Sequence, residues 1–257
     1  MSGTVYLVGA GPGAADLLTL RAARLLGEAD VVFYDALIAP EVLDLVGKAR
    51  KIPVGKRCGR HSTAQRFINK RLADAARDYR VVVRLKGGDP MLFGRAHEEL
   101  AYLKARGIRA EVVPGVTAAL AASAELGVSL TRRGSARTVA FVTPRVAHGE
   151  PQSGWVESVL AADTAAIYMG AGEAHAIAAA LMAAGKPAAT PVALVEAASL
   201  PGAGVQYGTL GGLPQLATRG GPTLILLGEV YAEALAEALA SARPDPQRAR
   251  LRSSQRE

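Results

Sequence analysis

The stretch VVVRLKGGDPMLFGR, residues 81–95, decides the fold because it joins a buried strand to a rigid turn. Its first six residues are apolar except for Arg84 and Lys86, which is typical of a strand covered on both faces of a parallel sheet. The turn Gly87-Gly88-Asp89-Pro90 allows close backbone approach, fixes the exit of the chain and places a carboxylate at the carboxyl end of the strand. A plain Asp-Pro turn would explain neither the two cations in the strand nor the Phe93-Gly94-Arg95 that follows.

A second glycine turn lies in VYLVGAGPGAADLLTL, residues 5–20, between a strand-like run and a helical pattern. The spacing Gly9-x-Gly11-x-x-Ala14 fits the loose dinucleotide-binding fingerprint, and Asp35 stands about 20 residues further on. Such turns are also common in α/β proteins for structural reasons alone. Pro12 lacks the backbone N–H that a pyrophosphate site would use, so the residues argue against NAD.

Strand-like and helix-like segments alternate through both halves of the chain, which predicts α/β layers. We expect strands at 5–9, 30–35, 50–54, 81–86, 111–114, 138–143, 165–169, 191–198, 205–210 and 222–228. We expect helices at about 15–27, 40–47, 65–78, 94–106, 116–126 and 173–184 and a short one before the last strand. The predicted domains are 1–115 with both glycine turns and 138–240, with a junction at 116–137 and a disordered basic tail at 241–257.

The composition favours a globular cytoplasmic protein. Half of the residues are apolar, and the one cysteine, Cys58, permits no internal disulfide. The histidines are scattered, so we assign no metal. Asp16 interrupts the first apolar run, which excludes a secretory signal, and we expect no membrane span. The net charge of +7 invites nucleic acid, but the cations are dispersed without interleaved aromatic residues, so we expect no nucleic-acid partner.

An ordered set of segments resembles the uroporphyrinogen-III C-methyltransferases, a group within the tetrapyrrole methylases. The set reads VYLVGAGPG, ADVVFYDALI, VGKRCGRH, VVRLKGGDP, FGR, VVPGVTAA, SLTRR, YMG and PVALVE, and it spans about residues 4 to 230. GAGPG and GGDP would indicate the superfamily alone, whereas YD-x-L and VGKR-x-G-x-H narrow the resemblance. It implies two α/β/α domains with the active-site cleft between them. It also implies S-adenosylmethionine as cofactor, S-adenosylhomocysteine as product, no metal, and a homodimer.

The resemblance also implies roles for individual residues. Asp35 matches a proton acceptor and Lys56 a proton donor, although Asp35 could simply cap the next turn and Lys56 could pair with a substrate carboxylate. The implied cofactor-binding residues are Pro12, Gly87, Gly88, Asp89, Leu92, Thr117, Ala118, Met169, Ala198 and Thr223. The implied substrate-binding residues are Arg57, Arg132, Arg133 and Met169.

The substrate of this group is a polycarboxylate, and arginine binds carboxylates in a bidentate manner. Further arginines that could serve are Arg60, Arg84, Arg95 and Arg145. Three segments depart from the usual pattern of the group. DPMLFGRAHEE stands where DPFxFGRGGEE is usual, SLTRRG where LTHRD is usual, and VTPR where VTGH is usual. Arg132 and Arg145 thereby replace histidines.

The function that the resemblance implies is methylation of uroporphyrinogen III at C2 and C7, through precorrin-1 to precorrin-2, for sirohaem or cobalamin synthesis. Because the chain begins almost at its first strand, we expect no dehydrogenase and ferrochelatase module. The alternatives are a later precorrin methyltransferase or an rRNA ribose methyltransferase of the same superfamily. From a different class, the alternative is an NAD-dependent oxidoreductase.

Overall fold

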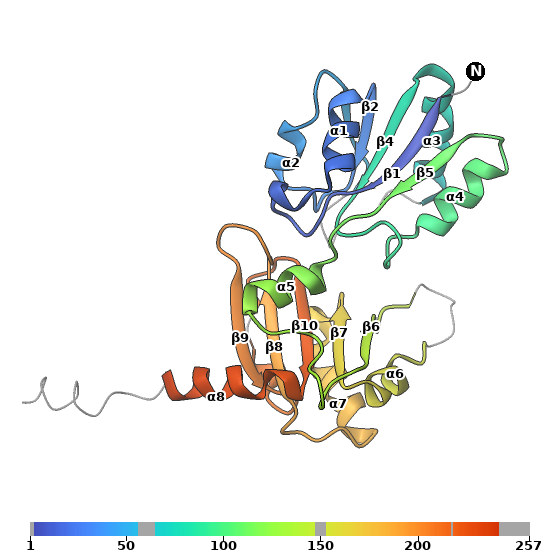
Figure 1. Ribbon diagram of the computed structural model, residues 1–257. Coiled ribbons are helices and arrows are strands. Elements are labelled where there is room, and N and C mark those ends of the chain that lie inside the picture. Colours follow the sequence, from blue (N-terminus) through green and yellow to red (C-terminus); the bar gives the residue numbers. More distant parts are fainter. Residues whose placement is uncertain (1–2, 56–64, 147–152, 217, 242–257) are drawn as a thin grey trace, which may run out of the picture. The chain divides into compact units, whose positions relative to one another are not determined.

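The computed structural model describes residues 3–55, 65–146, 153–216 and 218–241. The described residues form two compact units (Figure 1). The first comprises the chain up to Ala122 together with Ala197–Ala203, and the second comprises Ser123–Glu196 and the chain from Gly204 on. The division at Ala122 falls inside the predicted junction, whereas the return of residues 197–203 to the first unit is not anticipated by the sequence.

The first unit is built on a parallel sheet with strand order β3-β2-β4-β1-β5. The strands are β1 (Thr4–Gly9), β2 (Val31–Tyr34), β3 (Arg50–Pro53), β4 (Val81–Lys86) and β5 (Ala110–Val113). The central strands β1 and β4 pair in register from Thr4↔Val81 to Gly9↔Lys86. Both glycine turns therefore leave the sheet at the same edge, which is formed by the carboxyl ends of the strands.

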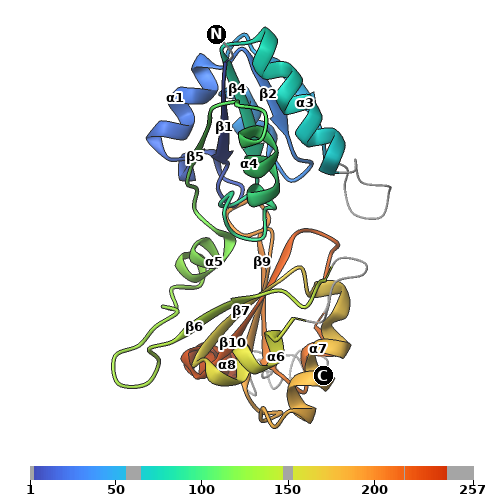
Figure 2. The ribbon, with the colours of Figure 1, turned by 90° about the vertical axis from the view of Figure 1, so that its right-hand side faces the viewer.

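Helices cover both faces of this sheet (Figures 1 and 2). One apolar cluster joins the sheet to α1 (Leu20–Glu28) and α2 (Pro40–Asp44), and a second joins it to α3 (Gln65–Asp78) and α4 (Ala96–Lys104). Alternate residues of β4 serve the two clusters: Val83 and Leu85 face α1 and α2, and Val82 faces α3 and α4. Arg84 and Lys86 share the face of Val82 because side chains alternate along a strand.

The second unit contains a mixed sheet with strand order β6-β7-β10-β8-β9, in which only β6 and β7 are parallel neighbours. Its strands are β6 (Val139–Val142), β7 (Thr164–Tyr168), β8 (Pro191–Glu196), β9 (Gly204–Thr209) and β10 (Thr223–Gly228). Helices α6 (Trp155–Ala161) and α7 (Ala174–Ala183) contribute to its apolar core, and α8 (Ala232–Ser241) packs on β8 and β9. Helix α5 (Ala118–Leu126) spans the point where the two units divide.

The predicted fold class, mixed α/β with two sheets, is confirmed. Two helices, α6 and α8, lie outside the predicted set. Several predicted elements are longer than the observed ones because the backbone turns. Thr19 caps α1, so this helix begins at Leu20 after a short 3₁₀ turn. Arg95 adopts φ 57°, so α4 begins at Ala96. The strand predicted to reach Ala198 ends at Glu196, because Ala197 adopts φ 54°.

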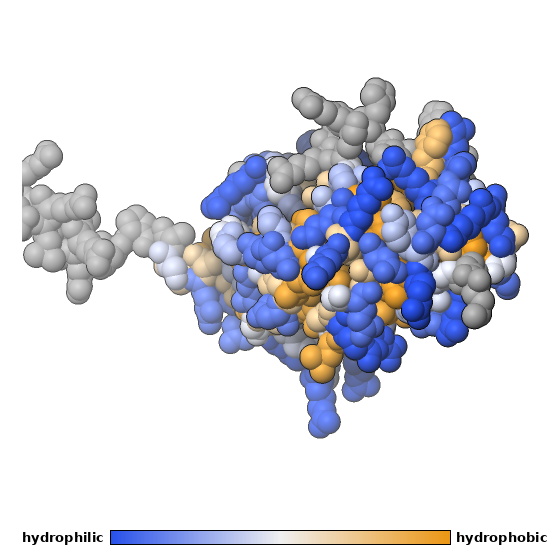
Figure 3. Space-filling model, turned by 90° about the horizontal axis from the view of Figure 1, so that it is seen from above, coloured by the Kyte–Doolittle hydropathy of each residue, from blue (hydrophilic) through white to orange (hydrophobic). Residues whose placement is uncertain are grey.

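Hydrophilic side chains cover most of the face drawn in Figure 3, with small hydrophobic patches between them. This is the normal surface of a folded domain. In the described part of the chain, no helix is both long enough and apolar enough to cross a membrane.

Candidate functional site

The two glycine turns meet at the carboxyl edge of the first sheet. Gly11 and Gly88 form an antiparallel bridge, in which the Gly88 N–H donates to the Gly11 carbonyl at 2.7 Å and the Gly11 N–H donates back at 3.3 Å. Gly9 and Gly115 complete the contact: a Cβ on Gly115 would lie 2.4 Å from the Gly88 carbonyl oxygen and 2.9 Å from the Gly9 Cα. The backbones approach so closely that only glycine fits there.

Asp89 joins this junction to the next loop. Its Oδ1 accepts a hydrogen bond from the Met91 N–H at 2.8 Å, and its Oδ2 accepts one from the Gly115 N–H at 2.9 Å. The carboxylate therefore ties the turn after β4 to the loop that leads into α5. Thr117, at the start of that helix, is buried and lies beside Gly88.

These contacts gather most of the predicted cofactor residues of the first unit around one edge. The residues placed there by chain position and contact are Pro12, Gly87, Gly88, Asp89, Leu92, Thr117 and Ala118. Gly87 is exposed, and apart from its chain neighbours the only described heavy atom within 4 Å of a Cβ built on it is the Leu37 Cβ at 3.7 Å. A ligand can thus approach the Gly87 backbone directly.

A short segment from much later in the chain completes this edge. We call Ala197–Ala203 the return segment, because it follows β8 and belongs to the first unit. Within it, the Ser199 Oγ accepts a hydrogen bond from the Ala14 N–H at 3.1 Å, and Leu200 packs against Gly13. Ala198, a predicted cofactor residue, is buried in the same segment. Ser199 and Leu200 carry no local motif, so nothing in the sequence marks them as site residues.

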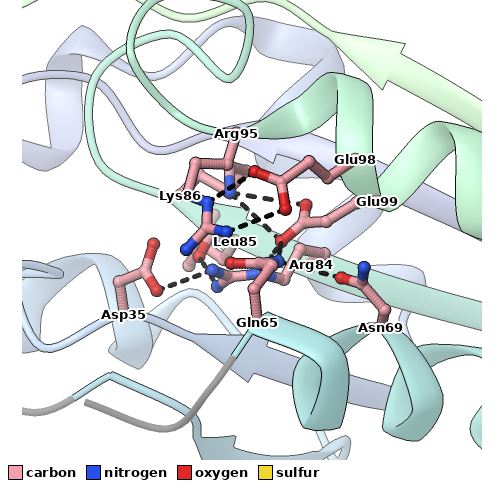
Figure 4. Close-up of polar contacts among 9 residues, drawn as sticks. All are labelled: Asp35, Gln65, Asn69, Arg84, Leu85, Lys86, Arg95, Glu98 and Glu99. Atoms are coloured by element: carbon pink, nitrogen blue, oxygen red, sulfur yellow. Dashed lines mark hydrogen bonds and ion pairs between the residues drawn. The ribbon is translucent and has the colours of Figure 1, made fainter. Parts of the chain in front are cut away.

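A buried charge cluster lies beneath the same edge, on the α3 and α4 face of the sheet (Figure 4). Arg84, 2% exposed, donates from Nη2 to Asp35 at 2.7 Å, from Nε to Glu99 at 3.1 Å and from Nη1 to the Leu85 carbonyl at 3.1 Å. Lys86 Nζ lies 3.3 Å from the Glu99 Oε1. Arg84 was a predicted candidate for substrate carboxylates, but its guanidinium is engaged inside the protein.

Glu99 is the fully buried carboxylate of this cluster. Besides the two cations, its Oε1 accepts a hydrogen bond from Gln65 Nε2 at 2.9 Å, and the same amide donates to Asn69 at 2.9 Å. Neither Glu99 nor Gln65 was among the residues predicted from the sequence. A glutamate in the first turn of a helix interacts favourably with the helix dipole even when it is exposed. The sequence therefore gives no reason to expect the Glu99 side chain to be buried.

The charges in this cluster shift the pKa values of its cations in opposite directions. Burial disfavours charge on Arg84, but the carboxylates of Asp35 and Glu99 outweigh that cost and raise its pKa. Burial, and then repulsion from Arg84, lowers the pKa of Lys86, although Glu99 opposes the shift. Arg84 is therefore a permanent cation next to Asp35.

The remaining predicted residues lie elsewhere. Met169 and Thr223 neighbour each other in the second unit, since Tyr168 pairs with Leu224, and Met169 adopts φ 57°. Arg132 and Arg133 lie in an exposed turn closed by an Arg132↔Ala136 bridge, with Arg132 3.8 Å from Glu233. Lys56, Arg57 and Arg60 lie outside the described residues.

Two other arginines keep exposed positions. Arg95 forms a bidentate pair with Glu98, at 2.6 Å and 2.8 Å, next to the charge cluster (Figure 4). Arg145 is exposed at the end of the described stretch after β6. No group of three or more metal-ligating side chains occurs among the residues that the structure describes.

Comparisons with known proteins agree on one family. The family model for tetrapyrrole (corrin/porphyrin) methylases matches residues 4–214. The siroheme synthases of Ectopseudomonas mendocina and Pseudomonas putida are 46% and 47% identical over 232 residues. That alignment covers 89% of this chain and 50% of each relative, so the chain spans about half the length of these curated relatives.

Solved structures give the same fold. A uroporphyrin-III C-methyl transferase from Thermus thermophilus, complexed with S-adenyl homocysteine, is 41% identical with a TM-score of 0.79. The match covers 90% of this chain and 99% of that one. A cobalt precorrin-4 methyltransferase matches with 27% identity and a TM-score of 0.77, over 88% of this chain and 95% of that one.

Proposed function

This chain belongs to the tetrapyrrole (corrin/porphyrin) methylases, and from that premise we propose that it methylates uroporphyrinogen III with S-adenosylmethionine. The product of two transfers, at C2 and C7, would be precorrin-2, formed through precorrin-1, for sirohaem or cobalamin synthesis. The similarity to uroporphyrin-III C-methyl transferase over nearly the whole of both chains supports this substrate. The homodimer stays a prediction from the resemblance, and the cytoplasmic location stays a prediction from the composition.

The single observation that carries the proposal is the locked junction of the two glycine turns. The exposed Gly87 and the left-handed Gly88 offer bare backbone at the strand ends, where a side chain would otherwise stand. Pro12 provides no N–H for a pyrophosphate, which argues against a dinucleotide at this junction. Pro12, Gly87, Gly88, Asp89, Leu92, Thr117, Ala118 and Ala198 of the first unit would hold the cofactor. Met169 and Thr223 are proposed as cofactor residues on the resemblance alone.

When bound, S-adenosylmethionine supplies a methyl group on a positively charged sulfur. A pyrrole carbon is electron-rich enough to take that methyl directly, so this chain's main work is to orient the two partners. The ring is cationic after it gains the methyl, and it must then lose a proton to a base. We assign that role to Asp35 because its partly exposed carboxylate stands at the strand edge, beside the glycine turns.

Lys56 and Arg57 are proposed for proton donation and substrate binding on the resemblance alone. Arg132 and Arg133 are exposed cations of the second unit, and a polycarboxylate substrate is the ligand that such pairs of arginines recognise. Met169 is proposed, on the resemblance alone, as an apolar contact for the substrate ring.

The test is an anaerobic assay with S-adenosylmethionine and uroporphyrinogen III, followed by mass spectrometry of the tetrapyrrole. We expect two added methyl groups with the wild-type chain and none with Asp89→Ala, since that change releases both the Met91 and Gly115 N–H groups. Asp44→Ala, at the exposed end of α2, is the control and should transfer methyl normally.

The other outcomes separate the alternatives. Binding of S-adenosylhomocysteine without methyl transfer to uroporphyrinogen III would move the proposal to a later corrinoid or to RNA. Protection against unfolding by NAD, with no binding of S-adenosylhomocysteine, would overturn it.

A further inference from the structure

Among the residues that the structure describes, Arg84 is the hydrogen-bond partner of the Asp35 carboxylate, at Oδ1. Asp35 follows β2, and its side chain is 29% exposed. The orientation of Asp35 thus depends on where the Arg84 guanidinium is held.

The Arg84 guanidinium is held by three partners at once. It lies on β4, the strand next to β2, and donates to Glu99, to the Leu85 carbonyl and to Asp35. A guanidinium is a planar fork, so fixing Nε on Glu99 and Nη1 on the carbonyl fixes the direction of Nη2. Glu99 is the side chain that decides this direction.

Glu99 is in turn held by side chains from two neighbouring elements, β4 and α3. It is 0% exposed in the first turn of α4, and it receives Arg84 and Lys86 from β4 and Gln65 from α3. The charged groups facing Asp35 from this cluster are therefore two cations, Arg84 and Lys86, and one carboxylate, Glu99. The amides of Gln65 and Asn69 add no charge.

A buried ion cluster of this kind is seldom worth more to stability than apolar packing of the same volume. Here the cluster connects the buried Glu99, through Arg84, to the Asp35 carboxylate at the strand edge where the predicted cofactor residues lie. We propose that Glu99 is a positioning residue that acts through Arg84 to hold Asp35 as the proton acceptor of the methyl transfer. The proposal rests on the proposed function.

The step that Asp35 completes is balanced in bonds and charge. The pyrrole carbon forms a bond to the methyl carbon as the carbon–sulfur bond breaks, and that electron pair stays on sulfur. The methylated ring then passes its surplus proton to the Asp35 carboxylate. Arg84 binds Oδ1, and we assign proton acceptance to Oδ2.

The test is Glu99→Gln in the full chain, which keeps the side-chain size and removes the charge. We expect S-adenosylhomocysteine affinity within about twofold of wild type, an unchanged KM for uroporphyrinogen III and a kcat at least about tenfold lower. Glu111→Gln, which breaks an exposed pair with Arg109, is the matched control and should leave kcat unchanged.

Two further variants separate positioning from a merely structural role. In an Asp35→Asn background, Glu99→Gln should slow the residual methyl transfer by much less than it slows wild type, because both act on one step. Arg84→Lys keeps the cation without the fork, and it should lower kcat while S-adenosylhomocysteine still binds.

Equal slowing by Glu99→Gln in both backgrounds, or a normal kcat in Glu99→Gln, would overturn the proposal. If Glu99→Gln does not fold, Arg84→Lys with an unchanged kcat would overturn it. A wild-type chain that binds S-adenosylhomocysteine but methylates no tetrapyrrole would instead remove the proposed function, and this proposal with it.

Discussion

Three glycines set how closely the backbones meet at the strand edge. Gly9 ends β1, Gly88 turns the chain after β4, and Gly115 precedes α5, and each stands within van der Waals reach of the others. A Cβ on Gly9 or Gly115 would meet backbone atoms, which cannot move aside as a flexible side chain can, and Gly88 adopts a left-handed φ of 65°. Asp89 then fixes the same loops by its two hydrogen bonds.

We therefore expect Gly115→Ala to lower the free energy of unfolding by about 1–3 kcal/mol or more and to weaken S-adenosylhomocysteine binding. The added Cβ would lie 2.4 Å from the Gly88 carbonyl oxygen. Urea unfolding and calorimetric titration measure the two effects.

Gly27→Ala is the matched control, because among the described residues a Cβ built there meets no heavy atom within 4 Å outside its own helix, and Gly27 sits inside α1. It should be neutral or stabilising by about 0.5–1 kcal/mol. Equal stability of the two alanine variants would contradict the close-packing account.

At the scale of elements, each sheet uses an aspartate just before one parallel strand to hold the start of its neighbour. Asp30 precedes β2, and its Oδ2 accepts from the Arg80 and Val81 N–H groups at the start of β4. Asp163 precedes β7, and its Oδ2 accepts from the Arg137 and Thr138 N–H groups before β6. The sequence shows the same pattern twice, as ADVVFY and ADTAAIY.

The Asp163 carboxylate predicts a pH dependence of stability. Hydrogen bonds from the Arg137 backbone, and then from Thr138, lower its pKa below the ordinary 3.8. The unfolded state therefore binds the proton first, so the stabilisation is complete above about pH 3.8 and is lost as the pH falls through the folded-state pKa. The urea midpoint of Asp163→Asn should be lower than that of the wild type at pH 7, and the difference between the two should disappear in strong acid.

Asp44→Asn is the control for removing one exposed carboxylate, and it should not reproduce this change with pH. A deficit of the same size at pH 7 and in strong acid would contradict the role given to the Asp163 charge.

At the scale of the whole molecule, the first unit is not one continuous piece of chain. After β8 the backbone adopts left-handed values at Ala197 and Ser199, and the return segment joins the first unit before β9 begins. Glu196, the last residue of β8, is fixed just before the return segment, because its carboxylate accepts hydrogen bonds from the Arg219 and Gly221 N–H groups. The edge that carries Pro12 is thus completed by residues almost two hundred positions later in the sequence, as the pair Ala14 and Ser199 shows.

Leu200→Ala should lower stability by about 1–2 kcal/mol, as expected for a half-buried leucine, and should weaken S-adenosylhomocysteine binding. The side chain packs against Gly13 beside the predicted cofactor residue Pro12. Thermal unfolding with and without S-adenosylhomocysteine measures both effects.

Leu239→Ala, on the exposed side of α8, is the matched control and should change neither. If Leu200→Ala also left both unchanged, the return segment would have no part in the site.

The sequence alone predicted most of the fold, because strands such as VVVRLK and turns such as GGDP follow from local sterics and apolar patterning. Two helices, α6 and α8, were not predicted from the sequence. Helix α6 has only seven residues, too few to show a clear helical period, and α8 follows the last strand, so no later strand bounds it.

The sequence also determined the family, since motif identity resides in local runs such as GAGPG and GGDP. Only the tertiary structure decided which charges face inward: Arg84 looked like a cation for substrate, but it is neutralised by Asp35 and Glu99. It likewise decided that Leu200 belongs beside Gly13. The physical reason is the same in both cases. A buried ion pair or a contact between distant segments exists only once the elements have packed, and no local preference encodes the partner.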